Sequence, residues 1–286
     1  MLGATGTIGR ATVRALVARG HEVVCFVRAT SIRSEATRDL AGATIRTGDV
    51  TDPASIARDG FRGERFNAIV SCMASRTGTP TDAWAIDHQA HLHALHVAQQ
   101  HGVTQMVLLS AICVQKPRLA FQHAKLAFEQ ALMASGITYS IVRATAYFKS
   151  LSGQVERVRR GKPFLLFADG TLTACKPISD EDLAAFLADC LDDRTRHDRI
   201  LPIGGPGPAI TPRAQGERLF ALLADKAEFA RIGRYYATES MLVLDPVTTR
   251  YDAGATPETG TETLFEYYAM LARTGAGVER GEHTVF

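Results

Sequence analysis

The sequence lacks the marks of a disulfide-bonded protein, an iron–sulfur protein or a nucleic-acid-binding protein. Its five cysteines are scattered and form no C-x-x-C pair. This spacing argues against a disulfide framework and an iron–sulfur cluster and suits a reducing compartment. The 32 basic and 30 acidic residues give a net charge of +2, so we expect no electrostatic field that attracts nucleic acid.

Long hydrophobic runs and a metal-binding spacing of histidines are also missing. The longest apolar run, residues 106–114, is interrupted by Ser110 and is too short to span a bilayer. No signal or transit segment precedes the first motif, so we expect a cytoplasmic protein, with membrane-surface contact and oligomeric state left open. Four histidines share one predicted helix, with no two of them four residues apart, and we expect them on a solvated surface: His88, His91, His93 and His96.

The order of predicted strands and helices indicates the fold. With 286 residues, 46% of them hydrophobic, the chain is long enough for a dinucleotide-binding domain and a smaller second lobe. We expect strands at 22–27, 44–47, 68–72, 105–110 and 139–143, and helices at 11–18, 83–101 and 121–135. This alternation predicts an α/β fold with a Rossmann-type doubly wound parallel sheet. We place an NADP-binding Rossmann domain at 1–146 and a mainly substrate-binding lobe at 147–286, with some segments returning to the Rossmann core.

A glycine loop opens the chain, with the sequence Gly3-Ala4-Thr5-Gly6-Thr7-Ile8-Gly9. Glycines at this spacing let the backbone turn tightly and approach a pyrophosphate, and the helix that follows offers amides and a positive dipole end to that charge. Only two residues precede the loop, whereas a strand usually has about five, so we expect the first strand to be truncated in this sequence. The loop residues that we expect to bind the cofactor are Gly3, Thr5, Gly6, Thr7, Ile8 and Gly9.

Two arginines favour NADPH over NADH. Arg28 follows the strand at 22–27, at the place where an NAD-specific protein typically has a carboxylate for the ribose hydroxyl. A guanidinium pairs instead with a 2′-phosphate, and Arg10, directly after the glycine loop, can approach the same group. A charged hydrogen bond contributes roughly 1.5–3 kcal/mol, which is enough to choose between the two cofactors.

Short polar and small residues end the next two predicted strands. Asp49 and Val50 follow the strand at 44–47, where a short acid can meet the adenine edge, and the strand at 68–72 ends in Ser71, Cys72 and Met73. Ligands of open α/β sheets bind at the carboxyl ends of the strands. We therefore add these five residues to the predicted cofactor site.

The predicted chemical site departs from a dehydrogenase pattern at one position. Ser110 closes the strand at 105–110 and Lys125 lies one turn into the next helix. In short-chain dehydrogenases the matching serine and lysine accompany a tyrosine four residues before the lysine, and that position is Phe121 here. Phenylalanine cannot protonate a forming alkoxide, so carbonyl reduction is disfavoured, whereas a conjugated C=C bond needs no such donor. Lys125 can bond the nicotinamide ribose and supply a proton; the alternative is an exposed helix lysine.

Longer motifs carry a resemblance to one family. The segment Leu108-Leu109-Ser110-Ala111-Ile112-Cys113-Val114-Gln115-Lys116-Pro117, followed by Phe121-Gln122-His123-Ala124-Lys125, resembles divinyl chlorophyllide 8-vinyl reductases of the NADPH-dependent, iron–sulfur-free type. These are atypical short-chain dehydrogenases related to NmrA and isoflavone reductase. Further matches extend over nearly the whole chain, at 70–72, 74–78, 139–143, 148–151, 153–156, 174–179, 201–207, 232–236 and 239–246.

The resemblance implies reduction of the C8 vinyl group of 3,8-divinyl chlorophyllide, or of its protochlorophyllide precursor, to an ethyl group. The cofactor would be NADPH, the catalytic residues Ser110 and Lys125, and the setting bacterial chlorophyll or bacteriochlorophyll biosynthesis. The substrate would contact Phe121, Tyr147, Phe148 and Lys149.

This sequence departs from the family pattern in two places. Ala144 and Tyr147 stand where the family has proline and phenylalanine, and between 220 and 228 the family carries some tens of additional apolar residues. Two alternatives stay open: an NADP-sensing module of the NmrA type, and a reductase of another conjugated C=C bond like the isoflavone reductases.

Overall fold

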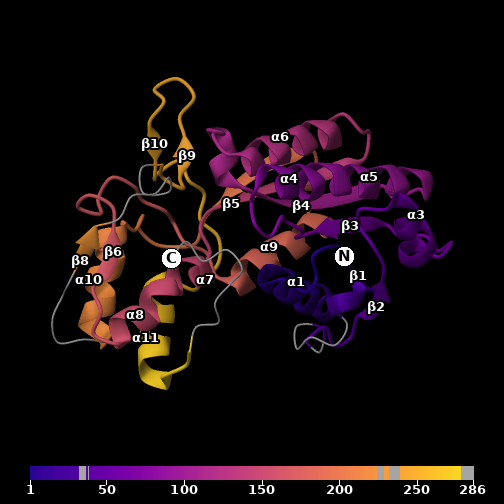
Figure 1. Ribbon diagram of the computed structural model, residues 1–286. Coiled ribbons are helices and arrows are strands. Elements are labelled where there is room, and N and C mark those ends of the chain that lie inside the picture. The colour runs from indigo at the N-terminus through magenta and orange to yellow at the C-terminus, as the bar shows by residue number, and fades with distance from the viewer. Residues whose placement is uncertain (32–36, 38, 224–228, 232–238, 278–286) are drawn as a thin grey trace. The chain divides into compact units, whose positions relative to one another are not determined.

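The computed structural model describes residues 1–31, 37, 39–223, 229–231 and 239–277. It divides into two compact units (Figure 1). Unit 1 comprises Met1–Arg143 and Leu183–Leu201, and unit 2 comprises Ala144–Asp182 and Pro202–Phe286. Each unit has its own hydrophobic core. The cofactor role of residues 1–146 and the substrate role of 147–286 stay predictions.

The sheet of unit 1 is built from two groups of strands that a single residue joins. The pairs β1–β2 and β3–β4 are parallel, and the second group has the order β3-β4-β5-β7. Leu2 forms parallel bridges to Phe26 and to Ser71, so the start of the chain lies between β1 and β3. This arrangement confirms the predicted Rossmann-type parallel sheet. The strands are β1 (Val24–Val27), β2 (Thr44–Thr47), β3 (Ala68–Ser71), β4 (Gln105–Ala111), β5 (Thr138–Ala144) and β7 (Arg199–Ile203).

The helices of unit 1 follow the strands, as the predicted alternation requires. The predicted helix at 83–101 consists of three consecutive segments, of which the middle one, η3, is π-helical. Such turns are rare and are often found at functional sites. The helices and helical turns are α1 (Thr7–Ala18), η1 (Ala29–Ser31), α3 (Pro53–Ser55), η2 (Ile56–Phe61), α4 (Pro80–Ala83), η3 (Trp84–Ala90), α5 (His91–Gln100), η4 (Ile112–Gln115), α6 (Ala120–Met133), α9 (Asp180–Asp192, which crosses the boundary between the units) and η6 (Arg194–Arg196).

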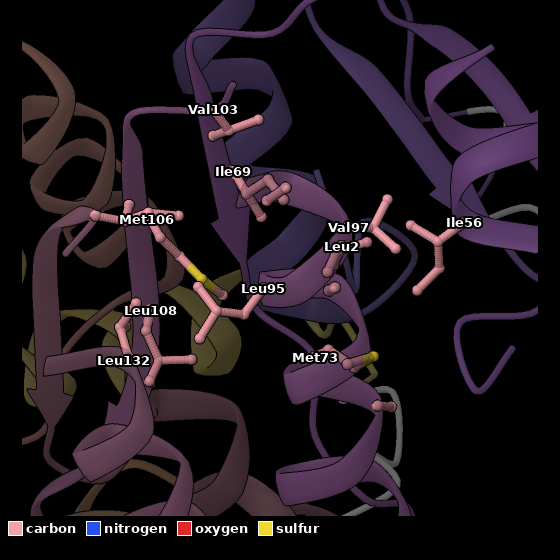
Figure 2. Packing of buried hydrophobic residues seen from close by; sticks show 14 of the residues in the cluster. Leu2, Ile56, Ile69, Met73, Leu95, Val97, Val103, Met106, Leu108 and Leu132 are labelled. Carbon is pink, nitrogen blue, oxygen red and sulfur yellow. The ribbon is translucent and has the colours of Figure 1, made fainter. Parts of the chain in front are cut away.

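The core of unit 1 packs helices against the sheet. Figure 2 shows Met106 and Leu108 of β4 near Leu95 of α5 and Leu132 of α6. These side chains are nearly or fully buried, and burial of each stabilises the fold by roughly 1.5–3 kcal/mol. The packed layer holds β3, β4, α5 and α6 in fixed positions, and these elements carry the chemical groups of the site.

Unit 2 is smaller and mixed in structure. Tyr268 and Leu271 of α11 pack with Leu219 of α10 and Val158 of α8 in its core. The α11 helix begins with a capping box between Thr263 and Glu266, which satisfies amides that the helix leaves unpaired. The elements are α7 (Phe148–Leu151), η5 (Ser152–Gln154), α8 (Val155–Arg159), β6 (Phe164–Leu166), α10 (Pro212–Leu223), β8 (Phe229–Arg231), β9 (Val243–Leu244), β10 (Tyr251–Asp252) and α11 (Leu264–Thr274).

Candidate functional site

The glycine loop has the geometry that a bound pyrophosphate requires. Gly3 has φ +70°, and a Cβ atom there would lie 2.5 Å from the backbone carbon of Cys72. A Cβ atom at Gly9 would lie 2.0 Å from the Gly3 oxygen. Helix α1 begins after Gly6, which offers no side-chain cap, and its first turn holds no acidic residue. The positive end of α1 is therefore suited to an anion, and these residues fit a dinucleotide.

The other predicted loop residues differ in accessibility. Thr5 and Thr7 are half-buried, whereas Ile8 is buried against the core. Arg10 pairs with Asp39, at 3.3 Å between Nη1 and Oδ2, and Arg28 is exposed directly after β1. The roles of both arginines toward a 2′-phosphate stay predictions.

Asp49 and Val50 follow β2, at the edge where the sequence predicts the adenine. The Asp49 carboxylate accepts hydrogen bonds from the hydroxyl and the amide of Thr51, at 2.6 and 2.8 Å. These bonds lower the pKa of Asp49, the hydroxyl having the larger effect. Val50 is partly buried against the unit 1 core. Asp49 is thus an exposed, ionised acceptor on a well-ordered turn.

Ser71 is held by a histidine that the sequence analysis did not select. Ser71 Oγ lies 2.9 Å from His91 Nε2, and His91 Nδ1 lies 2.8 Å from the Ile86 carbonyl oxygen. A carbonyl oxygen can only accept, so Nδ1 carries the proton and Nε2 accepts from the Ser71 hydroxyl. Burial lowers the pKa of His91 to about 4, with a further contribution from the charge of Lys125. His91 is therefore neutral near pH 7.

The position of His91 corrects one prediction. Only 1% of this residue is exposed, so the four histidines do not all lie on a solvated helix surface. Its ring packs against Phe128 of α6, with the ring centroids 4.7 Å apart. The helical spacing of the histidines did not reveal that one of them faces the core. Within the described ranges, no group of three or more His, Cys, Asp or Glu residues is arranged to hold a metal ion.

Cys72 and Met73 complete the end of β3. The Sγ atom of Cys72 lies 3.6 Å from the Thr12 hydroxyl of α1, and burial raises the pKa of the Cys72 thiol to about 12. Cys72 is thus an unionised thiol that packs beside the glycine-loop helix. The Met73 side chain is buried in the unit 1 core, and its amide donates to Ser71 Oγ at 3.4 Å.

Lys125 is partly buried and ion-paired. Its Nζ atom lies 2.9 Å from Oδ1 of Asp87 in η3, and the side chains are 12% and 0% exposed. The alternative of an exposed surface lysine is therefore wrong. Asp87 was missed in the sequence analysis, and the available signal was an acidic residue on the buried side of a predicted helix. Lys125 also influences the ionisation of His91 and Cys72, so these four residues gather near the carboxyl end of β3.

Ser110 points to a different cluster. It is 2% exposed, and its hydroxyl donates to Glu129 Oε1 at 2.5 Å. Glu129 is buried and accepts a further bond from Arg143 Nη2, also at 2.5 Å. This Ser110–Glu129–Arg143 chain links β4, α6 and β5. The catalytic role of Ser110 stays a prediction. In this structure the Ser110 hydroxyl donates its hydrogen bond to Glu129.

The four predicted substrate residues belong to both units. Phe121 is half-buried in the first turn of α6. In unit 2, Tyr147 and Lys149 are half-buried, whereas Phe148 is 3% exposed and packs on Tyr267 at 5.5 Å between ring centroids. Their contact with a substrate stays a prediction.

Comparisons with known proteins agree with this fold and with the binding of a nicotinamide nucleotide. A family model described as NAD(P)H-binding matches residues 3–194. The structure of UDP-glucose 4-epimerase from Thermotoga maritima is similar, with a TM-score of 0.77 and 16% identity over 95% of this chain and 96% of the other. At that identity the likeness concerns the fold alone. Fold and glycine loop together define a nicotinamide-nucleotide-binding protein of the Rossmann class.

Curated sequences then give the family. The divinyl chlorophyllide a 8-vinyl-reductase of Oryza sativa subsp. indica is 47% identical over 327 aligned positions, covering 99% of this chain and 81% of that protein. The enzyme of the same name from Arabidopsis thaliana is 43% identical, covering 99% and 78%. The chain belongs to the divinyl chlorophyllide a 8-vinyl-reductase family.

The alignment also bears on the length of the chain. It extends over 327 positions, whereas the chain has 286 residues, so the rice relative carries residues within the matched region that this sequence does not. The predicted place for them, 220–228, lies largely outside the described residues. Within the described part of the chain, none of the helices combines the length and the apolar character that a membrane crossing requires.

Proposed function

We propose that this protein reduces the C8 vinyl group of 3,8-divinyl chlorophyllide, or of its protochlorophyllide precursor, to an ethyl group in chlorophyll or bacteriochlorophyll biosynthesis. NADPH supplies a hydride when bound, a proton completes the two-electron reduction, and NADP⁺ leaves. The observation that carries the proposal is the 43–47% identity to divinyl chlorophyllide a 8-vinyl-reductases over nearly the full chain.

Within this reaction the described residues bind and orient the reactants. The glycine loop and the start of α1 hold the pyrophosphate. Lys125, fixed by Asp87, donates a hydrogen bond to the nicotinamide ribose and is placed as a proton source. Phe121 supplies an apolar surface where a tyrosine would offer a phenolic proton, which suits proton transfer to carbon rather than to oxygen.

A spectroscopic assay tests the function. Purified protein mixed with NADPH and 3,8-divinyl chlorophyllide should shift the Soret band to the blue, with one ethyl-substituted product for each NADPH oxidised. The control is the same mixture without NADPH. Binding of NADPH without any change in the pigment would favour the NADP-sensing alternative, and turnover of small phenolic substrates alone would favour an isoflavone-reductase-like enzyme.

The proposal includes a place of action, the bacterial cytoplasm with peripheral contact to a membrane surface. None of the described cysteines forms a disulfide bond, which agrees with a reducing compartment, and the matched relatives are chloroplast proteins. Cell fractionation with an antibody should recover the protein in the supernatant, with any membrane-bound part released by salt. Recovery only in membranes washed with alkaline carbonate would contradict this location.

A further inference from the structure

The π-helical turn η3 and the residue directly after it form polar contacts with two of the predicted site residues, Lys125 and Ser71. Asp87, in the middle of η3, lies 2.9 Å from Lys125. His91, directly after η3, accepts a hydrogen bond from Ser71 at the end of β3. One short segment therefore contacts both the predicted proton source and the predicted cofactor edge, although neither Asp87 nor His91 belongs to the predicted site.

Asp87 is buried, and Lys125 is the cation beside it. The Asp87 side chain is 0% exposed, and among the described residues Oδ2 has no hydrogen-bond partner. In addition to its contact with Lys125, Oδ1 accepts a long bond of 3.4 Å from the Ser75 amide. A buried carboxylate is strongly destabilised without a cation. The ion pair therefore holds the two side chains together.

Two other titratable groups of the described residues interact with Lys125, His91 and Cys72, and neither of them replaces the carboxylate. Burial lowers the pKa of His91, and burial raises the pKa of the Cys72 thiol to about 12, so both are uncharged near neutral pH. His88, on η3 itself, also has a lowered pKa because of burial. Asp87 is the negative charge that faces Lys125 in the described part of the site.

We propose that Asp87 is a positioning residue of this enzyme, which fixes the Lys125 ammonium at the carboxyl end of β3. His91 anchors the same turn to Ser71, so that η3 sets the distance between Lys125 and the end of β3. The inference rests on the proposed vinyl reduction for its kinetic consequence. The ion pair itself can be tested without that reaction.

The main test replaces Asp87 with asparagine. Asp87→Asn removes the charge and keeps an acceptor atom, so the Lys125 ammonium loses its ion pair and is held less firmly. We expect Lys125 to react with acetic anhydride at pH 7.5 roughly tenfold faster or more, as measured by mass spectrometry of the peptide that contains it. We also expect a lower kcat with little change in NADPH affinity.

The matched control is Glu64→Gln. Glu64 pairs with the buried Arg46 of unit 1 through both carboxylate oxygens, each at 2.7 Å, and lies outside the predicted site. This variant should label at Lys125 as the wild type does and keep its kcat. Equal labelling and equal kcat in Asp87→Asn and wild type would overturn the inference.

A second variant covers the case in which Asp87→Asn does not fold. Asp87→Glu keeps the charge but moves it by one methylene group, so Lys125 should stay slow to label while kcat falls. Unchanged kcat in Asp87→Glu, or labelling as fast as that of exposed lysines, would contradict the positioning role. If wild type binds NADPH but does not reduce the pigment, the proposed function fails, and the labelling comparison still decides the role of Asp87.

Discussion

Lys125 and Phe121 lie four residues apart at the start of α6, and only the lysine can donate a proton. The ion pair with Asp87 holds the ammonium in a mostly buried position. Few water molecules can compete there for its hydrogen bonds. In the proposed function a single side chain combines cofactor binding and proton supply, whereas a dehydrogenase with a tyrosine divides these tasks between two.

Lys125→Ala tests this combination. We expect kcat to fall by about 10²-fold or more, because a positioned general acid contributes roughly 10²–10⁴ in rate. The variant should also be less stable, since Asp87 is then buried without its partner. Rates are measured by the Soret shift under conditions in which circular dichroism shows the variant folded. Unchanged turnover would remove Lys125 from the mechanism and leave the family membership intact.

Arg28 is predicted to contact the 2′-phosphate that distinguishes NADPH from NADH. Arg28→Ser should weaken NADPH binding by about ten- to 150-fold, the equivalent of roughly 1.5–3 kcal/mol, while NADH binding stays nearly the same. Titration of nucleotide fluorescence measures both affinities. Arg65→Ser is a suitable control, since Arg65 is exposed in the same unit outside the predicted site. Equal losses for the two nucleotides would contradict a 2′-phosphate contact.

At the scale of elements, the glycine loop and the helix after it form the best-defined part of the site. The predicted helix at 11–18 begins earlier, at Thr7, because the loop turns directly into it. At Gly3 and Gly9 the loop lies so close to other backbone atoms that a Cβ atom would overlap with them. At Gly6 a Cβ atom would be at an ordinary contact distance.

Two glycine substitutions separate the structural from the binding role. Gly9→Ala should destabilise the protein by more than about 1 kcal/mol, because its Cβ would lie 2.0 Å from the Gly3 oxygen. Gly6→Ala should be nearly neutral for stability, since its Cβ would lie 3.5 Å from the same oxygen, and it should weaken NADPH binding. Urea unfolding without nucleotide compares the two. A Gly6→Ala variant less stable than Gly9→Ala would contradict this geometry.

At the scale of the whole molecule, buried ionisable groups set the pH range of stability. The pKa of His91 is lowered from 6.5 to about 4 by burial, so the unfolded chain binds the proton more readily than the folded one. The contribution of His91 to the free energy of unfolding is therefore fully present above about pH 6.5, and it is lost as the pH falls toward 4. The raised pKa of Cys72 and Cys175, each about 12 against 9.0, acts in the opposite sense above pH 9.

We therefore expect the free energy of unfolding to be greatest between about pH 7 and 8.5. It should fall on the acid side by at most about 1.4 kcal/mol per pH unit for each such histidine. Urea unfolding at a series of pH values measures the curve. His91→Asn should flatten the acid limb, because the substituted side chain has no proton to bind. An acid limb equally steep in this variant would assign the effect to other groups.

Much of the secondary structure followed from periodicity and turn residues. The strands at 44–47, 68–72 and 105–110 were predicted within one residue of their observed ends, because buried parallel strands are short apolar runs bounded by turns. The π-helical turn in 83–101 was not predicted, since its hydrogen-bond pattern leaves no distinct periodicity over seven residues.

By itself, the sequence determined the Rossmann class, the glycine loop and the NADPH-dependent family, because these depend on local spacing and on motifs. Only the tertiary structure decided that Asp87 pairs with Lys125, that His91 is buried against Ser71, and that Ser110 is bonded to Glu129. Each of these pairs joins residues from different elements. Their contact depends on how helices pack on the sheet, and the spacing of residues along the chain carries no record of that packing.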